Sequence, residues 1–289
     1  EAGQATPQQA VGAMLRSRRV VVVGDPLQVE PVFTTPPEFV EYFGKKILGD
    51  DWNRWSPTVA SVQTVADEVN PYGTNQISED FWLGSPLRVH RRCRDPMFTI
   101  ANEIAYNHKM IHGSDDPVER GEFAWGESCW FDVYGEVRGK HYVAEQGEFV
   151  LQLLYHYLEQ CGRLPDCYII SPFKDVTVKL LPFLRRNFRY QSIEKSQFDS
   201  WLKGRVGTVH TFQGKEEQVV LFVLGASFET KGAAGWASSK PNLLNVAVTR
   251  AKSRVFLVGS KEVWGSLSHF SFANSQLPAR VVGQGVELA

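Results

Sequence analysis

Residues 205–217 read RVGTVHTFQGKEE, and residues 242–252 read NLLNVAVTRAK. The first stretch joins a short apolar strand to a polar turn whose sharp point is Gly214. The second predicts a helix that carries one arginine, Arg250, at the end of an apolar, small-residue face. A glycine-containing loop after a strand can set backbone N–H groups against an anion, and an arginine on a packed helix can meet a phosphate in fork geometry. The two stretches therefore predict a phosphate site.

Around these stretches, strand-like and helix-like patterns alternate from Ser85 onward. The predicted strands are 128–134, 167–171, 206–210, 219–224 and 255–259, and the predicted helices are 95–106, 145–161, 176–187, 242–251 and 261–267. Such alternation favours a parallel sheet covered by helices. Ligands of these sheets bind at the carboxyl ends of the strands. Gly214 and Phe173 both follow predicted strands, which fits this rule.

The N-terminal part contains a different signal. Residues 19–24 (RVVVVG) form a continuous apolar run, which is typical of a strand buried on both faces. Before this run, residues 7–16 suit a short helix that has Thr6 as its N-cap and Pro7 at its first position.

Two further regions are rich in residues that interrupt regular structure. Residues 32–84 contain many Pro, Asp, Asn, Trp and Gly residues, with amphipathic patches at 37–48 and 59–69, and we interpret them as a linker with peripheral helices. Residues 226–239 are rich in Gly, Ala and Ser, which predicts a mobile loop.

Composition restricts the class of protein only loosely. The 289 residues are 43% hydrophobic, enough for one large or two small cores. With 31 basic against 32 acidic residues, overall charge gives no argument for nucleic acid, and a globular domain without such a partner stays possible. No apolar run approaches the roughly 20 residues of a membrane span, and no signal peptide is recognisable, so we expect an intracellular, cytoplasmic protein without a membrane partner.

The four cysteines show no metal-binding spacing. Cys93, Cys129, Cys161 and Cys167 include no CxxC pair. We therefore expect buried thiols in a reducing compartment and no metal site made by cysteine.

Five segments together resemble the motifs of superfamily 1 helicases. Residues 208–216 (TVHTFQGKE) resemble motif V, and residues 245–252 (NVAVTRAK) resemble motif VI. Residues 21–31 (VVVGDPLQVEP) resemble motif III, residues 89–97 (VHRRCRDPM) resemble motif IV, and the opening EAGQATP resembles the tail of motif II. The similarity is greatest to the group that contains the RNA helicase of nonsense-mediated decay and its bacterial relatives. One such motif alone is a weak signal, but five in the right order are a strong one.

This resemblance implies an α/β fold: a RecA-like parallel sheet flanked by helices, the P-loop NTPase fold, in the form of a second motor domain without its own P-loop. It assigns residues 1–34 to the end of a first motor domain, 35–84 to the linker and 85–289 to the second motor domain. The sequence contains no G-x-x-x-x-G-K-[ST], and GEVRGK at 135–140 has the wrong spacing. In this family that loop lies upstream of motif II. We therefore expect a fragment that is inactive by itself.

The resemblance also implies catalytic residues. Arg92 and Arg250 would supply positive charge to the phosphates of ATP, although arginines more often form surface salt bridges. Gln28 would orient a water molecule or sense the terminal phosphate, unless it is only an exposed loop amide. Glu1 resembles the carboxylate that activates the attacking water.

Three residues are implied for nucleotide binding. Asp25 belongs to this set, although its place in the loop favours bracing over metal binding. Gly214 would allow close backbone approach, or would serve as an ordinary turn glycine. Glu216 would accept hydrogen bonds from the ribose diol, the alternative being a solvated charge in a run of charged residues. ATP and Mg²⁺ are the implied cofactors of the intact protein.

For nucleic acid, the candidates share small hydroxyl groups, amides or loop positions that suit contact with a backbone. They are Ser171, Pro172, Phe173, Lys174, Thr208, His210 and Asn245. Phe173 could stack a base, but an aromatic residue in such a turn more often fills the core.

Two functional hypotheses remain open. The first is an ATP-dependent motor that moves on single-stranded DNA or RNA, with the N-terminal motor domain of the same polypeptide as partner. The second is a binding module derived from a motor, which grips nucleic acid or a partner without hydrolysis. An upstream P-loop sequence would favour the first. In either case the 19–24 run predicts docking elsewhere or self-association through residues 1–34.

Overall fold

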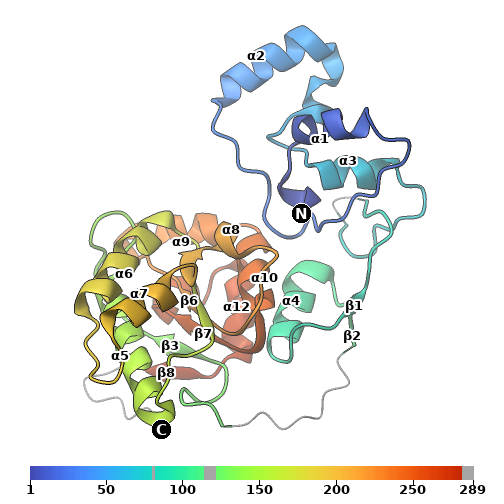
Figure 1. Cartoon of the computed structure of the whole chain (residues 1–289). Coiled ribbons are helices and arrows are strands. Elements are labelled where there is room, and N and C mark those ends of the chain that lie inside the picture. Colours follow the sequence, from blue (N-terminus) through green and yellow to red (C-terminus); the bar gives the residue numbers. More distant parts are fainter. Residues whose placement is uncertain (80–81, 114–121, 282–289) are drawn as a thin grey trace. The chain divides into compact units, whose positions relative to one another are not determined.

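The computed structural model describes residues 1–79, 82–113 and 122–281. The chain divides into two compact units. Unit 1 consists of Glu1–Val89 and Ala105–Ile111, and unit 2 consists of His90–Ile104 and His112–Ala289 (Figure 1). The three-part division expected from the sequence stays a prediction.

Unit 2 is built on a six-stranded parallel sheet. Its strands are β3 (Cys129–Asp132), β4 (Cys167–Ser171), β5 (Val206–Thr208), β6 (Glu217–Val223), β7 (Ala251–Val258) and β8 (Ala279–Val281). Their order is β5-β4-β6-β7-β3-β8, and every neighbouring pair is parallel. The predicted fold class, a parallel α/β sheet, is therefore confirmed.

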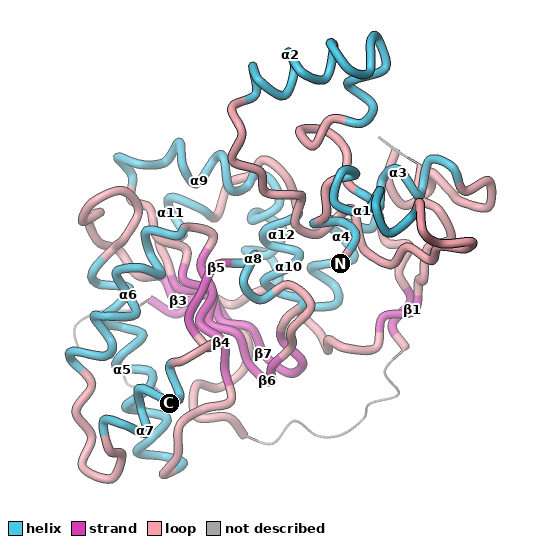
Figure 2. Tube along the Cα trace, turned by 45° about the horizontal axis from the view of Figure 1, so that its top comes forward, coloured by secondary structure: helices cyan, strands magenta, loops and turns pink. Residues whose placement is uncertain are grey.

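Helices cover both faces of this sheet (Figure 2). They are α5 (Ala144–Cys161), α6 (Lys174–Asn187), α7 (Lys195–Leu202), α8 (Val209–Phe212), α9 (Lys231–Ser238), α10 (Asn242–Thr249), α11 (Lys261–Trp264) and α12 (Ser268–Gln276). Because both faces are covered, the second halves of the central strands are apolar and buried, at residues 219–223 of β6 and 255–258 of β7.

One predicted strand of unit 2 is shorter than expected, and one predicted loop is helical. The strand expected at 206–210 ends at Thr208, and the chain turns at once into α8. The loop expected at 226–239 forms the short 3-10 helix η3 (Phe228–Thr230) and then α9. Alanine explains α9, since Ala234 and Ala237 are buried on one side of the helix and favour helical backbone.

Unit 1 contains short helices and little sheet. Its elements are η1 (Ala2–Gln4), α1 (Pro7–Met14), α2 (Pro37–Leu48), η2 (Gly49–Trp55) and α3 (Val62–Val69). The helix expected after Thr6 is confirmed, with Thr6 in extended conformation at the N-cap and its N–H donating to Gln9 Oε1 at 2.8 Å. Across the boundary between the units run β1 (Val89–His90), α4 (Met97–Tyr106) and β2 (Ile111–His112).

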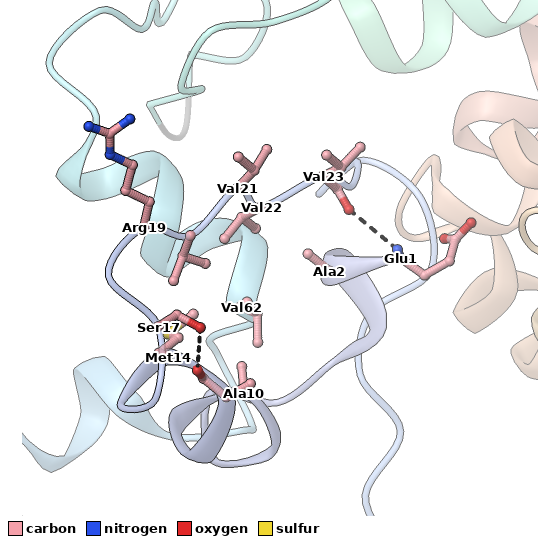
Figure 3. Close-up of a pocket in the computed structure, with 12 residues that line it drawn as sticks. Glu1, Ala2, Ala10, Met14, Ser17, Arg19, Val21, Val22, Val23 and Val62 are labelled. Carbon is pink, nitrogen blue, oxygen red and sulfur yellow. Dashed lines mark hydrogen bonds between the residues drawn. The ribbon is translucent and has the colours of Figure 1, made fainter.

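The strand predicted at 19–24 does not form. The side chains of Val21 and Val23 are 87% and 68% exposed. The carbonyl of Val23 accepts from the N–H of Ala2 at 3.1 Å and from the terminal amine of Glu1 at 3.3 Å (Figure 3). No strand pairs with this run in the described part of the chain. An apolar run becomes a strand only when neighbouring strands satisfy its backbone groups, and here it borders an open groove of about 520 Å³ (Figure 3).

The structure also bears on the burial of the cysteines and on membrane-spanning helices. Cys93, Cys129 and Cys167 are buried as expected, but Cys161 is exposed at the end of α5. Within the described ranges, no helix combines the length and the hydropathy needed to cross a bilayer.

Candidate nucleotide and nucleic-acid sites

The register of the sheet separates the candidate residues of unit 2 into two groups. Glu217 and Ala251 are partners at the start of β6 and β7, so Glu216 and Arg250 lie at the amino-terminal edge. Ser171 and Thr208 are partners at the end of β4 and β5, at the carboxyl edge. Gly214 was expected near the carboxyl ends. It lies instead at the opposite edge, because a crossover between parallel strands must return to the amino end before the next strand begins.

At the amino-terminal edge, Glu216 is held by two cations. Arg92 Nε donates to one oxygen of its carboxylate at 2.7 Å, and Lys252 Nζ lies 2.6 Å from the other. Arg92 Nη1 also donates to the carbonyl of Thr249 at 3.3 Å. The hydrogen bonds from Lys252 and then Arg92 lower the pKa of Glu216. The carboxylate is therefore ionised, and two basic side chains from different segments share it.

The loop that carries Arg92 is anchored through Cys93. The N–H of Cys93 donates to His90 Nε2 at 3.0 Å, and its sulfur lies 3.9 Å from the carbonyl of Val248. Burial, and then the positive charge of Arg92, lower the pKa of His90 to about 4. His90 is thus neutral near pH 7 and able to accept this hydrogen bond. Burial raises the pKa of Cys93 to about 12, so Cys93 packs as an uncharged thiol.

Arg250 lies next to this ion pair, where it contacts the carbonyl of Lys215, and it is 1% exposed. Its Nε donates to the carbonyl of Val246 at 3.2 Å, and its Nη1 donates to the carbonyl of Lys215 at 3.1 Å. Its Nη2 donates to Thr249 Oγ1 at 3.2 Å. The guanidinium therefore joins the end of α10 to the loop that precedes β6, and it fixes Glu216 indirectly.

Sequence reasoning missed Lys252 and His90 as members of this group. Both lie within the motif-like segments. The role of Lys252 comes from Glu216, which belongs to another segment, whereas His90 accepts from the N–H of Cys93 within its own segment. Spacing within one segment cannot reveal the contact of Lys252, but the position of His90 three residues before Cys93 was a local signal.

Glu1, Asp25 and Gln28 belong to unit 1. The carboxylate of Asp25 accepts from the N–H of Leu27 at 2.9 Å, from Gln28 Nε2 at 3.2 Å and from the hydroxyl of Tyr106. Asp25 thus braces its loop, as its position suggested. Glu1 is exposed.

At the carboxyl edge, the nucleic-acid candidates differ in access. Lys174 and His210 are exposed, and Thr208 is half-buried with its hydroxyl 3.2 Å from that of Thr211. The hydroxyl of Ser171 accepts from the N–H of Phe173 at 3.3 Å. The buried members of the set are Ser171, Pro172, Phe173 and Asn245.

Phe173 is a buried core residue, which agrees with the second of the two interpretations given for it above. Its ring stacks on that of His141 with centroids 4.3 Å apart, and the centroids of Trp236 and Trp264 lie 6.4 and 6.1 Å away. A ring that is 5% exposed offers no face to a base. Phe173 instead supports the aromatic layer above the end of β4.

Comparison with known proteins places the chain in a family. A model described as "AAA domain" matches residues 84–262. The chain belongs to this AAA domain family. The match contains the segments that resemble motifs IV, V and VI, and the resemblance to the second motor domain of superfamily 1 helicases is confirmed.

Known relatives are named as helicases. Helicase sen1 of Schizosaccharomyces pombe is 25% identical over 86% of this chain, and probable helicase MAGATAMA 3 of Arabidopsis thaliana is 25% identical over 90%. Putative helicase MOV-10 of Gallus gallus is 23% identical over 87%. The chain spans only 15%, 29% and 27% of the length of these three relatives. It is thus an AAA domain of a helicase family, homologous to part of each relative.

One solved structure is also similar, the C-terminal domain of a possible DNA helicase from a Lactobacillus. Its identity is 13%, its TM-score is 0.38, and the match covers 65% of this chain and 98% of that one.

Proposed function

We propose that this chain is the C-terminal half of an ATP-dependent superfamily 1 helicase or translocase that moves on single-stranded nucleic acid. The observation that carries the proposal is the arrangement at the amino-terminal edge of the sheet: Arg92 and Lys252 on the Glu216 carboxylate, with Arg250 fixed behind them. These residues come from three motif-like segments, 89–97, 208–216 and 245–252, which meet at this edge. Unrelated surface salt bridges would have no reason to bring three such segments together.

The residues at this edge fit a nucleotide. Arg92 is half-buried and can exchange Glu216 for a phosphate, since both are anions of suitable geometry for its guanidinium. The freed Glu216 carboxylate can then accept from two ribose hydroxyls. ATP with Mg²⁺ would supply the phosphoryl group and its counter-ion. Positive charge from Arg92 and Arg250 would stabilise the charge that develops on that group.

In unit 1, Glu1 and Gln28 are proposed to position the attacking water. Gln28 is suited to this because Asp25 holds its amide at 3.2 Å and restricts its rotation. Gly214 is proposed to let the backbone approach the nucleotide; its φ of +77° is one that glycine adopts without strain.

The carboxyl edge is proposed to contact single-stranded DNA or RNA through Lys174, Thr208 and His210. Helix α10 connects this function to the nucleotide site. Asn245 lies one turn before Thr249, whose hydroxyl donates to the Asn245 carbonyl at 2.7 Å, and Arg250 follows directly. A displacement of α10 at one end would therefore move the arginine at the other.

The alternative is a binding module that does not hydrolyse ATP. A G-x-x-x-x-G-K-[ST] upstream of the present sequence, the loop that cradles phosphates in P-loop enzymes, would argue against this alternative. The two proposals differ in one measurable property, nucleic-acid-stimulated ATP hydrolysis by a polypeptide that contains both motor domains.

The experiment compares that polypeptide with its Arg92→Ala variant, with and without a single-stranded oligonucleotide. We expect stimulated hydrolysis that falls on the order of 10³-fold in the variant. The present 289-residue chain alone should show no appreciable turnover. Absence of hydrolysis by the two-domain polypeptide, together with retained oligonucleotide binding, would favour the binding module. Robust hydrolysis by the 289-residue chain would contradict the proposed division of the active site.

A further inference from the structure

Helix α9 and the preceding η3 carry two aromatic side chains that are open to solvent. Phe228 is 68% exposed and Trp236 is 64% exposed. The Lys231 ammonium lies 6.0 Å from the centre of the Phe228 ring. The buried residues of α9 are Ala234, Ala237 and Ser238, so this helix packs on unit 2 through small side chains.

These side chains lie at the carboxyl edge of the sheet. The Trp236 ring centroid is 6.4 Å from that of Phe173, which follows the end of β4. The last residues of β4 and β5 are partners there, Ser171 and Thr208. Figure 1 shows α8 and α9 at the same end of unit 2. The aromatic pair therefore continues the surface that holds the proposed nucleic-acid contacts.

Two glycines, Gly232 and Gly235, lie close to Trp236 on α9. Apart from the neighbouring residues and the backbone of the helix itself, no described atom lies within 4 Å of the place that a Cβ would take at Gly232 or Gly235. The structure of unit 2 therefore gives no steric reason for glycine, which destabilises a helix interior relative to alanine. Their effect is to leave the helix backbone open beside the indole ring.

A single strand of nucleic acid fits this surface better than a protein partner. Every base has a face that stacks on an aromatic ring, independent of sequence. Lys231 and Lys174 supply exposed positive charge for phosphates on the same edge. Aromatic side chains are also enriched in protein interfaces, so the test below separates the two kinds of partner.

We propose that Trp236 and Phe228 stack bases of single-stranded nucleic acid. This inference rests on the proposed function and assigns to η3 and α9 the stacking role that the buried Phe173 cannot fill. Lys231 is proposed to contact a neighbouring phosphate.

The test measures binding of the 289-residue chain to fluorescein-labelled dT20 and U20 by anisotropy, over a series of salt concentrations. The variants are Trp236→Ala, Trp236→Phe, Phe228→Ala and the double variant Gly232→Ala with Gly235→Ala. Tyr72→Ala in unit 1 is the control, since Tyr72 is an aromatic residue of comparable exposure outside this surface.

We expect Trp236→Ala to weaken binding on the order of tenfold without a change in the salt dependence, because stacking releases no counter-ions. Trp236→Phe should retain most of the affinity. The double glycine variant should bind less tightly while its thermal stability stays equal or rises, a result that a purely structural role would not give. Tyr72→Ala should bind like the wild type.

Each contrary outcome has a distinct meaning. If the wild type binds both oligonucleotides and Trp236→Ala binds equally well, the stacking role is overturned and the proposed function stands. If the wild type binds neither, the nucleic-acid part of the proposed function falls together with the inference. If light scattering shows that the wild type self-associates and Trp236→Ala is monomeric, with oligonucleotide affinity unchanged, then α9 is a protein-docking surface and the proposal is wrong.

Discussion

Arg92 and Glu216 are 124 positions apart in the sequence, yet Arg92 Nε and Glu216 Oε2 are 2.7 Å apart in unit 2. Both side chains are partly exposed, so the pair contributes little to stability. Its significance is positional: it joins the segment before α4 to the loop before β6, and Lys252 at the start of β7 completes the group. In the proposed function, a bound nucleotide separates this pair: its phosphate binds Arg92 and its ribose hydroxyls donate to Glu216.

Glu216→Gln should lower the free energy of unfolding slightly near pH 7. The pKa of Glu216 is lowered from 4.5 in the folded chain, so its ionised form adds stability above that value. This contribution is lost as pH falls through the lowered pKa, where the carboxylate becomes protonated in the folded state as well. Urea denaturation of wild type and variant between pH 3 and pH 7 should therefore show a difference that shrinks as the solution becomes acidic.

Glu159→Gln, at an exposed position of α5, serves as the control and should match the wild type throughout. A Glu216→Gln difference that is as large at pH 3 as at pH 7 would show that the ion pair is not its source.

Arg250→Ala should destabilise unit 2 by about 2 kcal/mol or more, because it removes a buried guanidinium, leaves a cavity in its place and breaks the hydrogen bond to the Lys215 carbonyl. Arg250→Lys keeps the charge and should lose less stability, although it cannot reproduce the fork. In a polypeptide that contains both motor domains, Arg250→Lys should lower kcat far more than nucleotide affinity, since the charge acts mainly in the transition state. Thermal denaturation and steady-state kinetics measure the two effects separately. An unchanged kcat with a weakened nucleotide Kd would count against the assignment.

Phe173→Ala should cost about 3–5 kcal/mol of stability, the usual range for removing a buried aromatic ring. Phe173→Leu fills much of the same volume and should cost less than about 1.5 kcal/mol. If Phe173 is only a core residue, Phe173→Leu will bind dT20 as tightly as the wild type. A variant of near wild-type stability with strongly reduced affinity would restore Phe173 as a stacking residue.

Residues 1–34 should mediate self-association of the isolated chain. The exposed valines of the 19–24 run present apolar side chains beside an open groove, a combination that promotes pairing between copies. Sedimentation should show dimers in the wild type and monomers after deletion of residues 1–34. Val21→Lys should weaken the dimer without unfolding the chain, because Val21 is 87% exposed. A wild-type chain that is monomeric at high concentration contradicts the prediction.

The sequence by itself determined the parallel α/β sheet and the helicase family. Its central strands are continuous apolar runs that must be covered on both faces, and the motif-like segments lie in fixed order. Local chemistry also predicted the helix after Thr6 and the bracing role of Asp25, because a capping residue and a loop carboxylate act on neighbours in the chain.

Only the tertiary structure decided the rest. The run at 19–24 has the composition of a strand, but a strand requires backbone partners, and residues 226–239 have the composition of a loop, yet packing of Ala234 and Ala237 makes them helical. Lys252 belongs to the candidate site through its contact with Glu216, which lies in another segment and which spacing within one segment does not reveal. Phe173 and Trp236 have similar local chemistry, but the fold buries one ring beneath His141 and leaves the other open. The burial of a side chain and its hydrogen-bond or ion-pair partners depend on which segments meet in space. For this physical reason the sequence alone could not assign these roles.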